Sequence, residues 1–183
     1  MNPYIIFTDT ACDVPAELLA EWGVGVESLS FRFKDSEKEY FNGDIDPHAF
    51  YDEMRAGQVA QTAAANQAGF RRAFEEAVQQ GNDVLYIGFS SGLSTTFNSG
   101  RLACEDLSEE YPARKLIAVD TLAASAGEGL LVYLAVQRKK EGATIEEVAA
   151  YIESIKLNLC HLFTVDDLVY LKRGGRVSPA VAL

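Results

Sequence analysis

The chain has 183 residues, of which 48% are hydrophobic and 23% are charged, so it can bury a sizeable core as one domain or as one domain with a small appendage. Its formal net charge of -11, with no long basic run, argues against nucleic acid or an anionic membrane as a partner, because the averaged field repels both. Every apolar run is shorter than the roughly 20 residues that span a bilayer, so no integral membrane segment is expected.

The cysteines are three in number, far apart in the sequence and without a CxxC pair: Cys12, Cys104 and Cys160. Only two histidines, His48 and His161, are present as co-ligands. This pattern disfavours both a disulfide framework and a structural zinc site, and no cofactor or metal is expected. The apolar run near the N-terminus is too short for a secretory signal. We therefore expect a cytoplasmic protein.

Strands and helices alternate along the sequence. Short runs rich in β-branched or aromatic residues predict strands at 4–7, 83–89, 115–119 and 159–165. Capping residues and glycine stops predict helices at 15–22, 47–55, 67–80, 96–110, 125–141 and 144–158. The less regular stretch 24–40 is interpreted as an excursion at the sheet edge. The alternation predicts an α/β fold with a mostly parallel sheet and helices on both faces, and ligands beyond the carboxyl ends of its strands.

The most informative segment is the hydroxyl-rich turn from Ser90 to Thr96, which joins a predicted strand to a predicted helix and is called the serine turn below. Free backbone N–H groups, the positive end of the helix dipole and hydroxyls converge at such a turn. Together they can bind a carboxylate or phosphate without a formal positive charge. Two further polar turns, Thr8-Asp9 and Asp120-Thr121, follow other predicted strands, and we expect all three turns to share one rim.

A serine hydrolase is an alternative, because Gly88 to Gly92 satisfies the G-x-S-x-G pattern. Ser90 would be the nucleophile, with Asp120 and His161 as the order-compatible acid and base. Against this hypothesis, residues 93–96 look like further turn and cap rather than a direct entry into a helix. His161 falls in a predicted core strand, where a structural imidazole is expected. A nucleotide or phosphate binder is a third hypothesis, disfavoured because no Walker loop or G-x-G-x-x-G follows a strand.

Motifs spread along the chain resemble, in the same order, those of the DegV family of fatty-acid-binding proteins. They are the opening TDTACDVP at 8–15, Thr62 before a helix, the serine turn, the segment 120–129 and FTVDDLVYLKRGGRVS at 163–178. The last motif is the most specific. The resemblance implies a DegV-like α/β domain over residues 1–157, followed by the start of an α+β second domain over residues 158–183.

The resemblance implies a carrier rather than an enzyme. Such a carrier encloses one long-chain fatty acid and presents its carboxylate to a separate fatty acid kinase, which makes an acyl phosphate for phospholipid synthesis. In the family the carboxylate is held by hydroxyls that map onto Thr62 and onto Ser91 or Ser94, and spacing does not decide between the two serines. Arg173 and Arg176 become candidates for kinase contact. From sequence alone, they are equally well read as solvated charges flanking a glycine turn.

Several positions depart from the family pattern. Ala63 replaces a serine, Thr95 replaces a glycine, and residues 64–66 lack the usual proline. Family members also extend beyond the RGGR segment, where a further histidine helps to hold the head group. We therefore expect a truncated form with a pocket open on one side, exposed apolar surface and self-association through that face. A family member that no longer binds lipid is the alternative.

Overall fold

The main sheet is fully parallel. The computed structural model describes residues 3–165, 167–175 and 177. Four strands pair in the order β2-β1-β6-β7. Their bounds are Tyr4–Asp9 for β1, Val24–Glu27 for β2, Asp83–Gly88 for β6 and Leu116–Asp120 for β7. The strands predicted at 4–7, 83–89 and 115–119 are confirmed, and part of the irregular stretch 24–40 supplies the edge strand β2.

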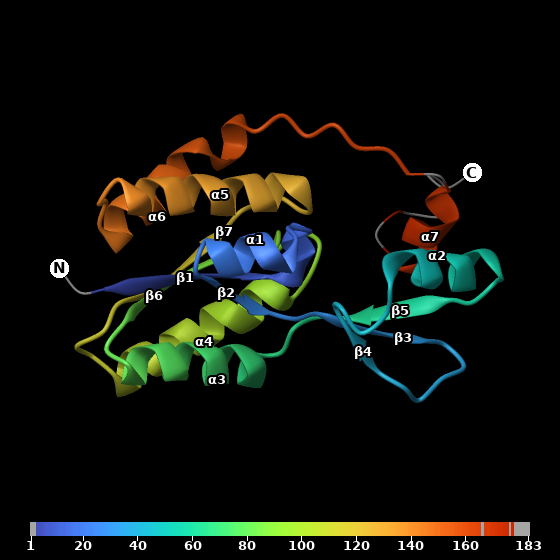
Figure 1. Ribbon diagram of the computed structural model, residues 1–183, viewed down its shortest axis with the longest axis horizontal. Coiled ribbons are helices and arrows are strands. Elements are labelled where there is room, and N and C mark those ends of the chain that lie inside the picture. Colours follow the sequence, from blue (N-terminus) through green and yellow to red (C-terminus); the bar gives the residue numbers. More distant parts are fainter. Residues whose placement is uncertain (1–2, 166, 176, 178–183) are drawn as a thin grey trace.

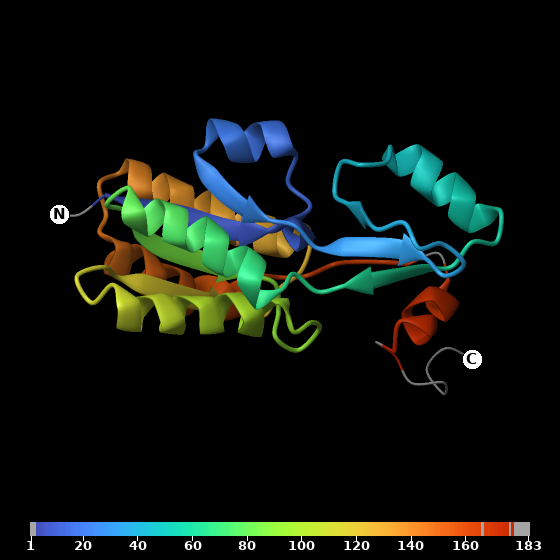
Figure 2. The same cartoon turned by 90° about the horizontal axis from the view of Figure 1, so that it is seen from below.

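Helices cover both faces of the main sheet (Figure 1). The bounds of these helices are Ala16–Glu21 for α1, Gln67–Gln79 for α3, Thr96–Glu110 for α4, Ala126–Lys140 for α5 and Ile145–Ile155 for α6. Two further helices, α2 at Pro47–Arg55 and α7 at Leu168–Arg173, lie away from the main sheet (Figures 1 and 2). Alternate residues of the central strands point to opposite faces. Ile6 and Leu85 pack with α1, α5 and α6, whereas Phe7 and Tyr86 pack with α3 and α4. The α/β architecture is as predicted.

Side-chain caps fix where helices begin. The Asp46 carboxylate accepts the N–H groups of His48 at 2.9 Å and Ala49 at 3.2 Å, which starts α2. Thr144 and Glu147 form the capping box of α6. These bonds satisfy first-turn donors that have no partner within the helix. The six predicted helices are confirmed. Among the described helices, none has the length and hydropathy required to cross a bilayer.

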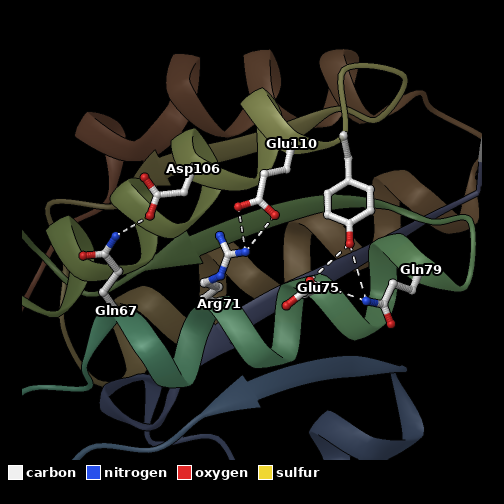
Figure 3. Close-up of polar contacts among 7 residues, drawn as sticks. Gln67, Arg71, Glu75, Gln79, Asp106 and Glu110 are labelled. Carbon is white, nitrogen blue, oxygen red and sulfur yellow. Dashed lines mark hydrogen bonds and ion pairs between the residues drawn. The ribbon is translucent and has the colours of Figure 1, made fainter.

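Polar contacts join α3 to α4 along their outer surface (Figure 3). Arg71 donates to both carboxylate oxygens of Glu110 at 2.8 Å each, and Gln67 donates to Asp106 at 2.6 Å. These groups are largely exposed, so solvent screens them and α4 is positioned mainly by its buried face, which includes Leu107. This packing matters because α4 begins where the serine turn ends.

A small antiparallel sheet lies beyond the carboxyl ends of the main sheet (Figure 2). Its order is β4-β3-β5, with bounds Tyr40–Phe41 for β4, Ser30–Phe33 for β3 and Ala60–Ala63 for β5. Phe31 and Phe33 stand on one face, and their rings lie 4.9 and 5.9 Å from that of Phe50 in α2. The sequence did not predict these strands, because they are short and β5 carries no alternating apolar pattern.

The strand predicted at 159–165 is wrong. The segment is irregular, and Leu162 and Phe163 are 93% and 86% exposed. It leaves the 3-10 turn η2, Lys156–Asn158, and runs to α7 beside the small sheet (Figures 1 and 2). No strand among the described residues pairs with it, so it has neither a hydrogen-bond ladder nor a core to enter. The expected exposed apolar surface is present here. Self-association through it, and the division at residues 157 and 158, stay predictions.

Candidate functional site

Three polar turns meet at the carboxyl ends of β1, β6 and β7. Asp9 Oδ2, at the end of β1, accepts the Phe89 N–H at 3.0 Å and the Tyr86 hydroxyl at 2.8 Å. At the end of β7, Asp120 Oδ1 accepts the Ser91 N–H at 3.2 Å. Asp9 therefore ties β1 to the end of β6, and Asp120 ties β7 to the serine turn, so the predicted common rim is confirmed.

The backbone N–H groups of the serine turn are largely engaged inside the protein. The Ser90 N–H donates to the Ala123 carbonyl at 2.9 Å. Five more N–H groups of the turn also donate to acceptors within the protein: those of Ser91, Gly92, Leu93, Ser94 and Thr96. The expectation of a turn with free amides is wrong for these residues, because nearby side chains and carbonyls already accept from them. Among the described residues, the N–H groups of Thr95, Phe97 and Asn98 have no protein acceptor. A ligand would meet these helix-start donors and the hydroxyls.

Ser91 and Ser94 lie in the same turn but are held differently. Ser94 Oγ lies 2.9 Å from Thr96 Oγ1 and accepts the Thr96 N–H at 3.2 Å. Thr96 is buried and Ser94 is half-buried, so this hydroxyl has a fixed position. Ser91 is exposed, and its hydroxyl has no partner among the described residues. Ser94 is thus the pre-organised donor and Ser91 the freer one.

Thr62 lies on the small sheet rather than in the serine turn. It is opposite Phe31 in the antiparallel pair of β5 and β3, so both side chains share the face that carries the aromatic rings. The Thr62 side chain is exposed, and within the described residues no hydrogen bond joins it to Ser91 or Ser94. In Figure 1, β5 runs back toward the main sheet, which places its carboxyl end near the rim.

The two candidate docking arginines have different outcomes. Arg173 is the last residue of α7, is exposed, and has its guanidinium carbon 5.4 Å from the centre of the Tyr170 ring. Arg176 lies outside the described residues. The exposure of Arg173 and its position over the Tyr170 ring fit a solvated surface charge and a kinase-contacting residue equally well.

The groups required for a serine hydrolase are not assembled. Ser90 is 6% exposed, and its Oγ accepts the Gly92 N–H at 3.3 Å. His161 lies against α5, where a Cβ built on Gly127 would come within 2.4 Å of His161 Cε1. Within the described part of the chain, no hydrogen bond connects Ser90, Asp120 and His161. The prediction of His161 as a core residue is also wrong, because its side chain is exposed.

Glu128 is a buried acid that the sequence did not single out. Its Oε1 accepts the Thr8 hydroxyl at 3.0 Å, and its Oε2 has no partner among the described residues. Burial, together with the nearby Asp9, raises the pKa of Glu128 to about 10. Burial also raises the pKa of Asp9, although three hydrogen bonds counteract this. Near neutral pH, Glu128 is therefore protonated.

The burial of Glu128 follows from its small neighbours. A Cβ on Gly129 would lie 2.9 Å from the Cys12 carbonyl oxygen and 2.6 Å from Val14 Cγ2, so only glycine lets α5 approach this closely. The two glycines that flank Glu128 are the signal by which it could have been found. An acid in the first turn of a helix otherwise looks like a surface residue that interacts with the dipole.

Comparisons with known proteins agree with this architecture. A family model described as "Uncharacterised protein, DegV family" matches residues 4–183. A DegV domain-containing protein of Clostridium perfringens is 43% identical over 183 residues, which are 100% of this chain and 63% of that protein. The chain thus spans less than two thirds of the length of this relative.

Two solved structures are similar over almost the whole chain. One, from Thermus thermophilus, shows fatty acid binding of a DegV family protein; it has a TM-score of 0.84 and 32% identity, over 98% of this chain and 62% of that one. A stearic acid-binding protein from Eubacterium ventriosum has a TM-score of 0.84 and 26% identity, over 97% of this chain and 62% of that one. The ligands named for these structures are fatty acids. With the family model matched from residue 4 to residue 183, the chain belongs to the DegV family.

Proposed function

We propose that this chain binds a long-chain fatty acid in the cytoplasm and presents its carboxylate to a separate fatty acid kinase, which makes an acyl phosphate for phospholipid synthesis. The observation that carries the proposal is the fixed hydroxyl of Ser94 at a rim that adjoins an aromatic sheet face. The similarity to fatty-acid-binding structures of the same family supports it. In this role the chain binds and shields its ligand and performs no chemistry on it.

The head group is held by hydroxyls and by the start of α4. When the Thr96 hydroxyl donates to Ser94 Oγ, which also accepts the Thr96 N–H, the Ser94 hydrogen is left to donate to a carboxylate oxygen. The free N–H groups of Thr95 and Phe97 lie in the same first turn, where the helix dipole favours an anion. Thr62, from the small sheet, supplies a second hydroxyl once the ligand bridges the two sheets.

The acyl chain supplies most of the binding free energy. Each buried methylene contributes roughly 0.8 kcal/mol, so a long chain binds tightly even with few polar contacts. Two leucines at the rim, Leu93 and Leu122, are 45% and 47% exposed beside the hydroxyls. They provide apolar surface at the rim that a hydrocarbon chain would cover.

Binding of palmitate to the purified chain tests this proposal directly. Native mass spectrometry and titration calorimetry should show one bound fatty acid. Ser94→Ala should weaken palmitate binding about tenfold, because it removes a hydrogen bond to a charged group. Ser91→Ala should have a smaller effect, because the Ser91 hydroxyl is not fixed before binding.

Ser108→Ala is the matched control. Its hydroxyl donates to the Cys104 carbonyl at 2.7 Å within α4, away from the rim, so palmitate affinity should stay unchanged. A wild-type chain that takes up no fatty acid would overturn the proposal. Equal palmitate affinity in the Ser94 and Ser108 variants would remove Ser94 from the site.

A further inference from the structure

Asp120 places a negative charge next to the proposed head-group site. Its Oδ1 accepts two N–H groups, from Ser91 at 3.2 Å and from Leu122 at 3.1 Å. Its Oδ2 has no partner among the described residues. We infer that Asp120 determines head-group specificity, selecting a singly charged carboxylate over a doubly charged phosphate. This inference rests on the proposed function.

The ammonium of Lys156 does not cancel that charge. Lys156 donates to the main-chain carbonyl of Asp120 at 2.9 Å, and its ammonium also lies 2.6 Å from a carboxylate oxygen of Glu153. Lys156 is therefore paired with an acid of its own. A ligand at the serine turn meets the field of Asp120 with little compensation, and each additional negative charge on the ligand increases the repulsion.

Asp120 also removes a donor that a phosphate would use. Phosphate sites at helix starts rely on several free backbone N–H groups. Here the Ser91 N–H is directed at Asp120, and the Ser90 N–H is directed at the Ala123 carbonyl. A carboxylate has two oxygens, which a serine hydroxyl and a helix-start N–H can satisfy. A phosphate has three oxygens and would leave one facing the acid.

The test compares palmitate with hexadecyl phosphate, two ligands with the same hydrocarbon length. At a pH of about 8 the phosphate is doubly charged. The wild-type chain should bind palmitate at least about tenfold more tightly. Asp120→Asn keeps an oxygen that can accept the Ser91 N–H but removes the charge. Because Coulomb energy is proportional to ligand charge, a gain of about threefold for palmitate should accompany a gain of about tenfold for the phosphate.

Asp106→Asn is the control for net charge. Asp106 accepts from Gln67 on the outer surface of α4 (Figure 3), about 15 Å along the helix from its start by the rise per residue. This variant should change neither affinity.

Raising the salt concentration from about 0.05 M to about 1 M provides a test without any variant. The preference of the wild type should shrink, since salt screens exposed charges.

The outcomes separate this inference from the proposed function. A wild type that prefers palmitate, with a preference reduced both by Asp120→Asn and by salt, supports the role of Asp120. Equal binding of the two ligands by the wild type, or a preference that neither change affects, overturns that role and leaves fatty-acid binding standing. A wild type that binds neither ligand overturns both.

Discussion

The two sheets of this chain are stabilised to different degrees. The main sheet buries both faces of β1 and β6 under five helices, with Val84, Leu85, Tyr86 and Ile87 completely buried. The small sheet rests on one cluster of rings, and α2, which covers it, stays partly exposed along its length. The serine turn is attached to the first sheet and Thr62 to the second. In the proposed function, the rigid sheet would fix one ligand-binding hydroxyl, and the less tightly packed sheet would let the other adjust to the ligand.

The largest expected effect comes from truncating the same type of side chain in the two regions. Phe74→Ala, in the core under the main sheet, should lower the free energy of unfolding by about 3–5 kcal/mol. Phe50→Ala, in the half-buried cluster of the small sheet, should cost about 1 kcal/mol. Urea denaturation measures both values. Equal losses would mean that the two sheets form one equally packed unit.

A pH-dependent effect should follow from Glu128. Its pKa is raised in the folded protein from 4.5 to about 10, so the free energy of unfolding falls as the pH rises through this interval. Glu128→Gln is neutral and of similar shape. It should therefore raise the free energy of unfolding by about 2 kcal/mol at pH 7, and by less at pH 5. Thermal melts across this pH range measure the difference, and a gain independent of pH would contradict it.

Two glycines of α5 contact different parts of the molecule. Gly129 faces the well-packed residues after β1, and Gly127 faces the crossing segment 159–165. Gly129→Ala should destabilise the protein by about 1 kcal/mol, because the clash with the Cys12 carbonyl outweighs the helix propensity of alanine. The nearest neighbours of a Cβ at Gly127, as in Gly127→Ala, are the exposed His161 ring and the Ala123 methyl group, and the ring can move away. The free energy of unfolding should then be unchanged or slightly higher. A large loss at Gly127 would show that the crossing segment is firmly packed.

The smallest expected effect on stability is at Arg173. Arg173→Glu reverses an exposed charge at the end of α7, so the melting temperature and palmitate affinity should not change. If this arginine contacts the kinase, acyl phosphate formation on the bound fatty acid should fall about tenfold. Arg55→Glu, on exposed α2, is the control. Kinase turnover that is equal for both variants would contradict a docking role for Arg173.

The sequence predicted what depends on local pattern. Apolar strands at Tyr4 and Asp83 and the caps Asp46 and Thr144 have signals of a few consecutive residues, and each was located within a residue or two. The rim followed from the rule that parallel strands end at a common edge. Ser91 and Ser94 are three residues apart, so the sequence alone placed both in the same turn.

The features that sequence did not reveal depend on distant contacts. β5 is a strand because it pairs with β3. The stretch around Leu162 is irregular because none of the described strands pairs with it. The occupation of the Ser91 N–H by Asp120 joins residues 29 positions apart. Glu128 is buried only because helix α5 packs closely on the end of β1. Apart from the glycines that flank Glu128, such contacts carry no local signature.

Most backbone N–H groups of the serine turn donate to acceptors within the protein. The groups that keep the turn in shape are therefore largely different from the groups proposed to bind a ligand. The hydrogen bonds of the N–H groups between Ser90 and Thr96 maintain the loop, whereas the proposed binding of a head group relies on side-chain hydroxyls and on the helix-start N–H groups of Thr95 and Phe97. One substitution at such an oxygen can change what is carried without changing the fold. If the chain carries a fatty acid as proposed, its ligand preference is open to stepwise evolutionary change at low risk to folding.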